Sequence, residues 1–141
     1  MQRTAIAHWS GGLKDGKGMS TSASGVLKNT PYSFSTRFES QPGTNPEELI
    51  AAAHAGCFTM ATSALLGRVG FTPDRLSTEA TVTLEQVQGN WTITTIQLKM
   101  DARVPGISKD KFAEIAEDAR ANCAISRALK ADITLDARLT S

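Results

Sequence analysis

The two cysteines of this chain, Cys57 and Cys123, are its residues with the most specific chemistry. Each lies in a largely apolar segment with a helical pattern. Their wide separation fits neither the short spacing of metal ligands nor the dense cysteine framework of a small secreted protein. It fits two thiols that the fold brings together, one of which reacts while the other closes a disulfide.

On the residues alone, either thiol could be the nucleophile. A reactive cysteine is a thiolate, and a nearby cation or a helix N-terminus favours that form. Cys57 lies deep in its predicted helix, where the N-terminal dipole has faded. It would therefore need a cation, and Arg37 in the preceding segment is the best candidate. Cys123 lies where the helical pattern slips, in a separate short helix or a kinked continuation of the preceding one. If the helix restarts there, its thiol is close to free backbone N–H groups that favour a thiolate. Both cysteines could instead be small, inert core residues.

Two carboxylates and a histidine share the helix of Cys57. Glu47 and Glu48 complement the helix N-terminus, and for Glu48 capping is the simpler interpretation. Glu47 lies about 15 Å from Cys57 along the helix axis, at 1.5 Å per residue. It could serve that thiol only through an extended Arg37 or from the helix of a second subunit. His54, one turn before Cys57, is more simply a buried or interface histidine than a general base or a zinc ligand.

The composition predicts a single globular domain over residues 1–141, with 40% hydrophobic and 21% charged residues. A net charge of +1 gives no reason to expect nucleic acid or an anionic membrane as a partner. The first residues lack the apolar core of a signal peptide, and no apolar run approaches a membrane span. We therefore expect a cytoplasmic protein, in which a disulfide would be transient.

Periodicity predicts the elements that must position these residues. Strands are expected over 4–9 and 17–27, a half-buried strand over 32–39, a long hairpin over 76–87 and 91–104, and a closing strand over 133–139. Helices are expected from Pro46 to about Arg68, with Asn45 as N-cap, from Ser108 onward, and over 123–129.

Three consequences of this pattern concern the site. A strand over 32–39 would place Arg37 on the face opposite the aromatic side chains. The segment from Ala51 to Ala64 is so uniformly apolar or small that its helix should be buried all round. The order of elements predicts an α+β fold with antiparallel sheets around this long central helix.

The chain resembles the OsmC (osmotically inducible protein C) family of the OsmC/Ohr superfamily, along essentially its whole length. The resemblance is carried above all by an Asn-Pro-Glu helix start with a cysteine ten residues after its glutamate. The matching stretches include Pro31–Glu39, Gly43–Ile50, Ala53–Phe58 and Cys123–Lys130.

This resemblance implies a thiol-dependent peroxidase that reduces organic hydroperoxides. Cys57 matches the peroxidatic cysteine and Cys123 the resolving one, while Arg37 and Glu47 match the pair that activates the first thiol. It also implies an intertwined homodimer with active sites at the subunit interface, and an external dithiol, such as a lipoyl-bearing protein, as reductant. No metal, flavin or haem is implied.

One residue departs from the family pattern, which usually has proline where this chain has Ala124.

We expect a pocket for the alkyl tail of a substrate, lined by Phe38, Phe58, Met60 and Ala61.

Two other classes of protein compete with the peroxidase interpretation. One is a non-enzymatic module that binds an apolar ligand, and the other is a structural zinc protein that uses His54 and both cysteines.

Overall fold

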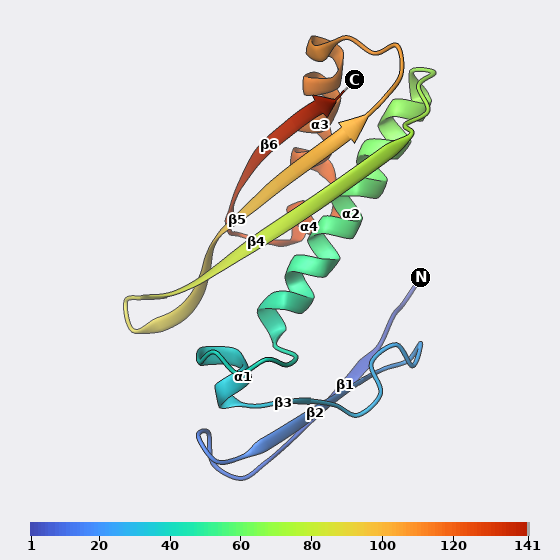
Figure 1. Cartoon of the computed structure of the whole chain (residues 1–141). Coiled ribbons are helices and arrows are strands. Elements are labelled where there is room, and N and C mark those ends of the chain that lie inside the picture. The colour runs from blue at the N-terminus through green and yellow to red at the C-terminus, as the bar shows by residue number, and fades with distance from the viewer. Residues whose placement is uncertain (141) are drawn as a thin grey trace. The chain divides into compact units, whose positions relative to one another are not determined.

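The computed structural model of the chain describes residues 1–140, which form two compact units that divide between Leu49 and Ile50. Figure 1 labels the elements in chain order. The first unit holds β1 (Ala5–Ser10), β2 (Lys17–Ser22), β3 (Thr30–Tyr32) and α1 (Phe34–Phe38). Helix α2 (Pro46–Arg68) begins at the end of this unit. The second unit continues with β4 (Arg75–Val87), β5 (Asn90–Arg103), α3 (Lys109–Asn122), α4 (Ala124–Ala128) and β6 (Asp132–Thr140).

The first unit is an antiparallel sheet in the order β1-β2-β3, which confirms the strands predicted near residues 4–9 and 17–27. Glycine is required at position 18 because the rings of Trp9 and Tyr32 meet there, 5.6 Å apart. A Cβ on Gly18 would lie 2.5 Å from the Tyr32 ring and 2.8 Å from the Trp9 ring. Every residue of β1 is exposed within the single chain.

The strand predicted over 32–39 is wrong, because β3 ends at Tyr32 and a short helix, α1, follows. The alternation of aromatic and polar residues is typical of a strand, but a local capping box stabilises a helix here instead. Ser33 Oγ accepts the N–H of Thr36, and the Thr36 hydroxyl accepts the N–H of Ser33. The helical spacing then brings the rings of Phe34 and Phe38 together, with centroids 5.1 Å apart.

The second unit contains the sheet β4-β5-β6. The predicted hairpin of β4 and β5 is confirmed, and its two-residue turn is formed by Gln88 and Gly89, both at positive φ, as a primed turn requires. The prediction of purely antiparallel sheets is wrong, however, because β6 pairs parallel to β5. The chain returns through α3 and α4, and a helical crossover of this kind joins parallel neighbours.

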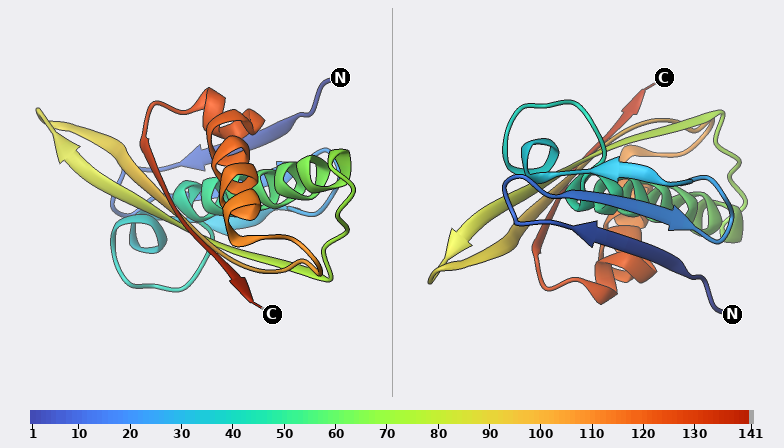
Figure 2. Two further views of the ribbon diagram at one scale, coloured as in Figure 1. Left: turned by 90° about the horizontal axis from the view of Figure 1, so that it is seen from above. Right: turned by 90° about the horizontal axis from the view of Figure 1, so that it is seen from below.

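The core of the second unit lies between one face of this sheet and two helices. Alternate side chains of β5 are buried, from Ile96 to Ala102. They pack with Phe58 and Leu66 of α2 and with the buried face of α3, which comprises Phe112, Ile115, Ala116 and Ala119. Figure 2 shows α3 crossing α2 on this side of the sheet.

Helix α2 begins as predicted, since Asn45 Oδ1 accepts the N–H of Glu48 at 2.8 Å. The prediction that it is buried all round is wrong for the single chain. Its buried residues form one stripe at intervals of four, namely His54, Phe58, Thr62 and Leu66. The helix is also long and apolar enough to cross a membrane by length and composition, with a mean hydropathy of 1.6, contrary to the expectation above. The buried stripe, however, is what the core helix of a folded domain presents.

Candidate active site

The structure brings the two predicted thiols together in the second unit. Cys57 lies on α2, half-buried, beside the stripe that faces the core. Cys123 lies between α3 and α4 and is 4% exposed. Both are free thiols, and Cys123 lies close enough to Cys57 to influence the pKa of its thiol. A more accessible sulfur thus lies next to a buried one.

Cys123 occupies the break between two helices, as the interruption of the helical pattern predicted. It is the C-cap of α3 and the N-cap of α4, with extended backbone angles (φ −62°, ψ 148°). Its sulfur takes the place of a capping oxygen and accepts the backbone N–H of Ser126 at 3.4 Å. Ala124 begins α4 at the position where the family usually has proline, so the helix restarts without that residue.

Within the single chain, the environment of Cys57 does not favour a thiolate. Burial raises the pKa of the Cys57 thiol, and hydrogen bonding and charge repulsion from Cys123 raise it further. The backbone N–H groups of Ile125 and Ala124, at the start of α4, act in the opposite direction but do not cancel the rise. A nucleophilic Cys57 therefore needs an additional positive charge.

Arg37 and Glu47 form an ion pair in the first unit. Arg37 Nε and Nη2 both donate to Glu47 Oε1, at 3.2 and 2.9 Å. Glu47 is 12% exposed, and its second oxygen, Oε2, is buried with no hydrogen-bond partner among residues 1–140. The expected orientation of Arg37 away from the aromatic face is wrong, since its guanidinium lies over the Phe38 ring, 5.0 Å from the centroid.

His54 is completely buried, as its simpler interpretation predicted. Its Nε2 lies 2.7 Å from Ser126 Oγ, which lies 3.1 Å from Cys123 Sγ. Burial lowers the pKa of His54. No group of three or more His, Cys, Asp and Glu side chains within residues 1–140 could hold a metal ion. The zinc alternative therefore finds no ligand set there.

Ser126 is the site residue that sequence reasoning missed. A serine three residues after an N-cap has its backbone N–H directed at the capping atom and its side chain in the same turn. The restart of the helix at Cys123, read together with this spacing, was the signal that could have found it.

Within each unit, the residues predicted to line an alkyl pocket do not share one cavity. Phe58 is completely buried in the core, and Met60 is 75% exposed. Ala61 lines a cavity of about 310 Å³ with Cys123. Phe38 lines a separate cavity of about 240 Å³ in the first unit, together with Arg37.

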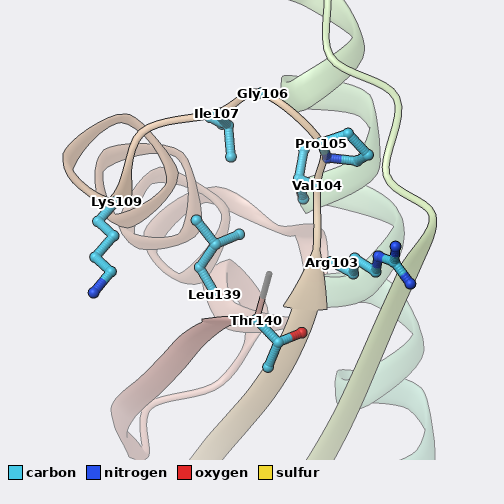
Figure 3. A pocket seen from close by; sticks show the side chains of 8 residues that line it. All are labelled: Arg103, Val104, Pro105, Gly106, Ile107, Lys109, Leu139 and Thr140. Atoms are coloured by element: carbon cyan, nitrogen blue, oxygen red, sulfur yellow. The ribbon is translucent and has the colours of Figure 1, made fainter.

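A further cavity, of about 370 Å³, lies where β5, the loop before α3 and β6 meet. Figure 3 shows Val104, Ile107 and Leu139 pointing toward one another there. The Arg103 guanidinium points instead toward β4, and Asp74, the residue before that strand, forms an ion pair with it at 3.3 Å. None of the predicted site residues lines this cavity.

Comparison with known proteins gives concordant matches. The profile of the family described as OsmC-like protein matches residues 38–138. The chain is 53% identical to peroxiredoxin OsmC of Escherichia coli over 135 residues, which cover 96% of this chain and 94% of the relative. The organic hydroperoxide resistance protein OhrB of Bacillus subtilis has a similar fold, with a TM-score of 0.68 and 25% identity, over 97% of this chain and 98% of that one. An OsmC-like protein of unknown function from Vibrio cholerae has a TM-score of 0.78 at 16% identity, over 98% and 99% of the two chains.

Proposed function

The chain belongs to the OsmC-like protein family, and we propose that it reduces organic hydroperoxides to alcohols with its two cysteines as the only redox groups. Its relative of 53% identity is named a peroxiredoxin, and the chain is accordingly a peroxidase. The observation that carries the finer proposal is that a half-buried Cys57 and a buried Cys123, both free, lie in the same core cluster and interact. A pair of this kind can attack a peroxide and then close a disulfide.

The reaction has three steps in this proposal. The Cys57 thiolate attacks the distal oxygen of the hydroperoxide, and the O–O bond breaks to give a sulfenic acid and, with one proton, an alcohol. The Cys123 thiol then condenses with the sulfenic acid, so that a disulfide forms and water leaves. An external dithiol restores both thiols by two exchange reactions and becomes a disulfide itself. A lipoyl-bearing protein would supply such a dithiol, and the cytoplasm is the compartment that we propose for this cycle.

Arg37 is the positive charge that we propose for the activation of Cys57. Its ion pair with the nearly buried Glu47 fixes the guanidinium, which is a donor that does not lose its proton. Glu47 and Cys57 are ten residues apart on α2, about 15 Å along the axis. In a homodimer, the pair from one subunit would serve Cys57 of the other. The exposed apolar face of α2 supports such a dimer.

The test is a single turnover with one equivalent of cumene hydroperoxide, in which free thiols are counted before and after. We expect the wild-type protein to lose both thiols and Cys57→Ser to keep its remaining one. Cys123→Ser should stop at a sulfenic acid that dimedone traps. If the wild-type protein keeps both thiols, the peroxidase proposal fails, and an apolar-ligand module with inert cysteines becomes the better hypothesis. Equal kcat/KM values for cumene hydroperoxide and hydrogen peroxide would contradict a preference for organic substrates.

A further inference from the structure

Cys123, Ser126 and His54 form a chain of buried polar groups. Of these three residues, the reaction proposed above uses only Cys123. Ser126 Oγ lies 3.1 Å from Cys123 Sγ and 2.7 Å from His54 Nε2. The Ser126 backbone N–H is directed at the same sulfur, at 3.4 Å. His54 is completely buried and Ser126 is 8% exposed, so water competes little for these contacts.

The second ring nitrogen of His54 decides which atoms donate and which accept in this chain of hydrogen bonds. Nδ1 is buried and has no hydrogen-bond partner among residues 1–140. A buried N–H without a partner is rarer than a bare acceptor, so the proton of the neutral imidazole lies on Nε2. Nε2–H then donates to Ser126 Oγ, and the Ser126 hydroxyl proton donates to Cys123 Sγ. The low pKa that burial gives His54 keeps the imidazole in this neutral form.

We propose, on the basis of the peroxidase function above, that His54 and Ser126 form a donor chain that stabilises Cys123 as the departing thiolate when the disulfide is reduced. In this step a thiolate of the dithiol attacks Cys57 Sγ and forms a mixed disulfide. The Cys57–Cys123 bond breaks, and its electron pair goes to Cys123 Sγ, where the Ser126 hydroxyl and N–H meet the charge. The second thiol of the reductant then displaces Cys57, and the two protons of the dithiol end on the two protein sulfurs.

Accessibility supports this assignment of roles. Cys57 is half-buried and Cys123 is buried, so an external thiol reaches Cys57 first. Exchange is also faster when the sulfur that leaves is stabilised as an anion, so donors at Cys123 favour its departure once Cys57 has been attacked. Arg68 of α2 and Asp118 of α3 are charged groups of opposite sign in the cavity beside Cys123, and Arg127 of α4 is exposed. The hydrogen-bond donors of Ser126 are therefore the polar groups that point directly at the sulfur of Cys123.

The first test isolates Cys123, because the chain has only two cysteines. In Cys57→Ala protein, the ultraviolet absorbance of the thiolate is followed against pH. Adding Ser126→Ala removes a charge-assisted hydrogen bond, and we expect the thiolate to appear about one pH unit higher, with a roughly tenfold smaller thiolate fraction at a given pH. Ser126→Thr keeps the hydroxyl and should restore the original curve. Thr62→Val is the matched control, since it removes a buried hydroxyl that donates to the Phe58 carbonyl.

Two substitutions of His54 separate a positioning role from packing. His54→Leu fills the space without a donor, whereas His54→Gln keeps an N–H donor near the position of Nε2. We expect His54→Leu to move the thiolate absorbance of Cys123 to higher pH by less than Ser126→Ala does, and His54→Gln to restore most of the change. A residue that only packs would alter the free energy of unfolding and leave the thiolate curve where it is.

The second test identifies the sulfur that the reductant attacks. The disulfide is formed with diamide and treated with 2-mercaptoethanol, and the products are trapped in acid, alkylated and mapped by mass spectrometry. We expect the adduct on Cys57 and a free Cys123, and a roughly three- to tenfold slower reduction by dithiothreitol in Ser126→Ala. An adduct on Cys123, or a thiolate curve unaffected by Ser126→Ala, overturns the inference. Neither result bears on the oxidation of Cys57 by hydroperoxide, and both can be read in a protein that fails to react with one.

Discussion

Replacing Ala124 by proline should stabilise the chain and also make Cys57 less reactive. Ala124 is exposed at the first position of α4, where proline is tolerated because the N–H has no acceptor within the helix. Cys123 before it already has the extended conformation that proline demands of its predecessor (φ −62°, ψ 148°). The substitution thus fits the native backbone. By restricting the unfolded chain, it should raise the free energy of unfolding by about 0.4–1 kcal/mol.

The same N–H acts on Cys57. Burial raises the pKa of the Cys57 thiol, and the backbone N–H groups of Ile125 and Ala124 oppose that rise. Proline at position 124 removes the weaker of these two donors. Because the Ala124 N–H is the smallest of the influences on this thiol, we take the low end of a net hydrogen bond, about 0.5 kcal/mol, and expect the thiolate fraction of Cys57 to fall roughly twofold at a given pH.

Both effects can be measured in a Cys123→Ser background, where Cys57 is the remaining cysteine. Urea unfolding should show a midpoint higher by roughly 0.2–0.5 M, and iodoacetamide should alkylate Cys57 more slowly. Ala124→Gly is the matched control, because it keeps the N–H and should lower stability without changing the alkylation rate. If Ala124→Pro is alkylated as fast as its parent, the N–H of Ala124 does not act on the thiolate. If its midpoint falls, the backbone does not accept proline there.

Three further predictions concern the site. Cys123→Ser should keep both helix caps, so the free energy of unfolding measured with urea should change by less than about 0.5 kcal/mol. Peroxidase turnover sustained by dithiothreitol should be lost in the same variant. Glu47→Gln keeps an oxygen for Arg37 but loses the charge. Because Arg37 is 37% exposed, its ion pair with Glu47 should contribute under about 1 kcal/mol to stability, whereas kcat/KM for cumene hydroperoxide should fall at least roughly tenfold. The pKa of His54 is lowered in the folded chain. Just below about pH 6.5, therefore, only the unfolded chain binds a proton on the imidazole of this residue. Urea unfolding should show stability falling there by up to about 1.4 kcal/mol per pH unit, a slope that His54→Gln lacks.

Local signals predicted the elements that carry the thiols. Asn45 and Pro46 start α2, Ser108 starts α3, and the break at Cys123 starts α4, each through contacts within a few residues. The prediction for the segment after Tyr32 failed because two local signals favoured different structures. The capping contact of Ser33 stabilises a helix, whereas the alternation of aromatic and polar residues favours a strand.

Contacts between distant segments were beyond such reasoning. The direction of β6 depends on how α3 and α4 cross the sheet, which no pattern within residues 132–140 encodes. The contact of His54 with Ser126 joins residues 72 positions apart. The ion pair of Arg37 with Glu47 was one of two options that helix length left open, and the family resemblance also implied it. The position of Arg37 on a helix rather than a strand was not predicted.

The second subunit proposed above would account for two features of the single chain. The pKa of the Cys57 thiol is raised, and the small residues of α2 opposite the core, such as Ala52, Ala53 and Gly56, are exposed. A second subunit packed on this face would cover it and supply the proposed cation. Gly56→Leu tests this directly, because a Cβ on Gly56 meets nothing within 4 Å in the single chain. Without a partner, the substitution should stabilise the helix by up to about 1 kcal/mol. With one, it should shift sedimentation toward monomer and abolish hydroperoxide reduction. A Gly56→Leu protein with unchanged sedimentation and full activity would show that this face is not the interface.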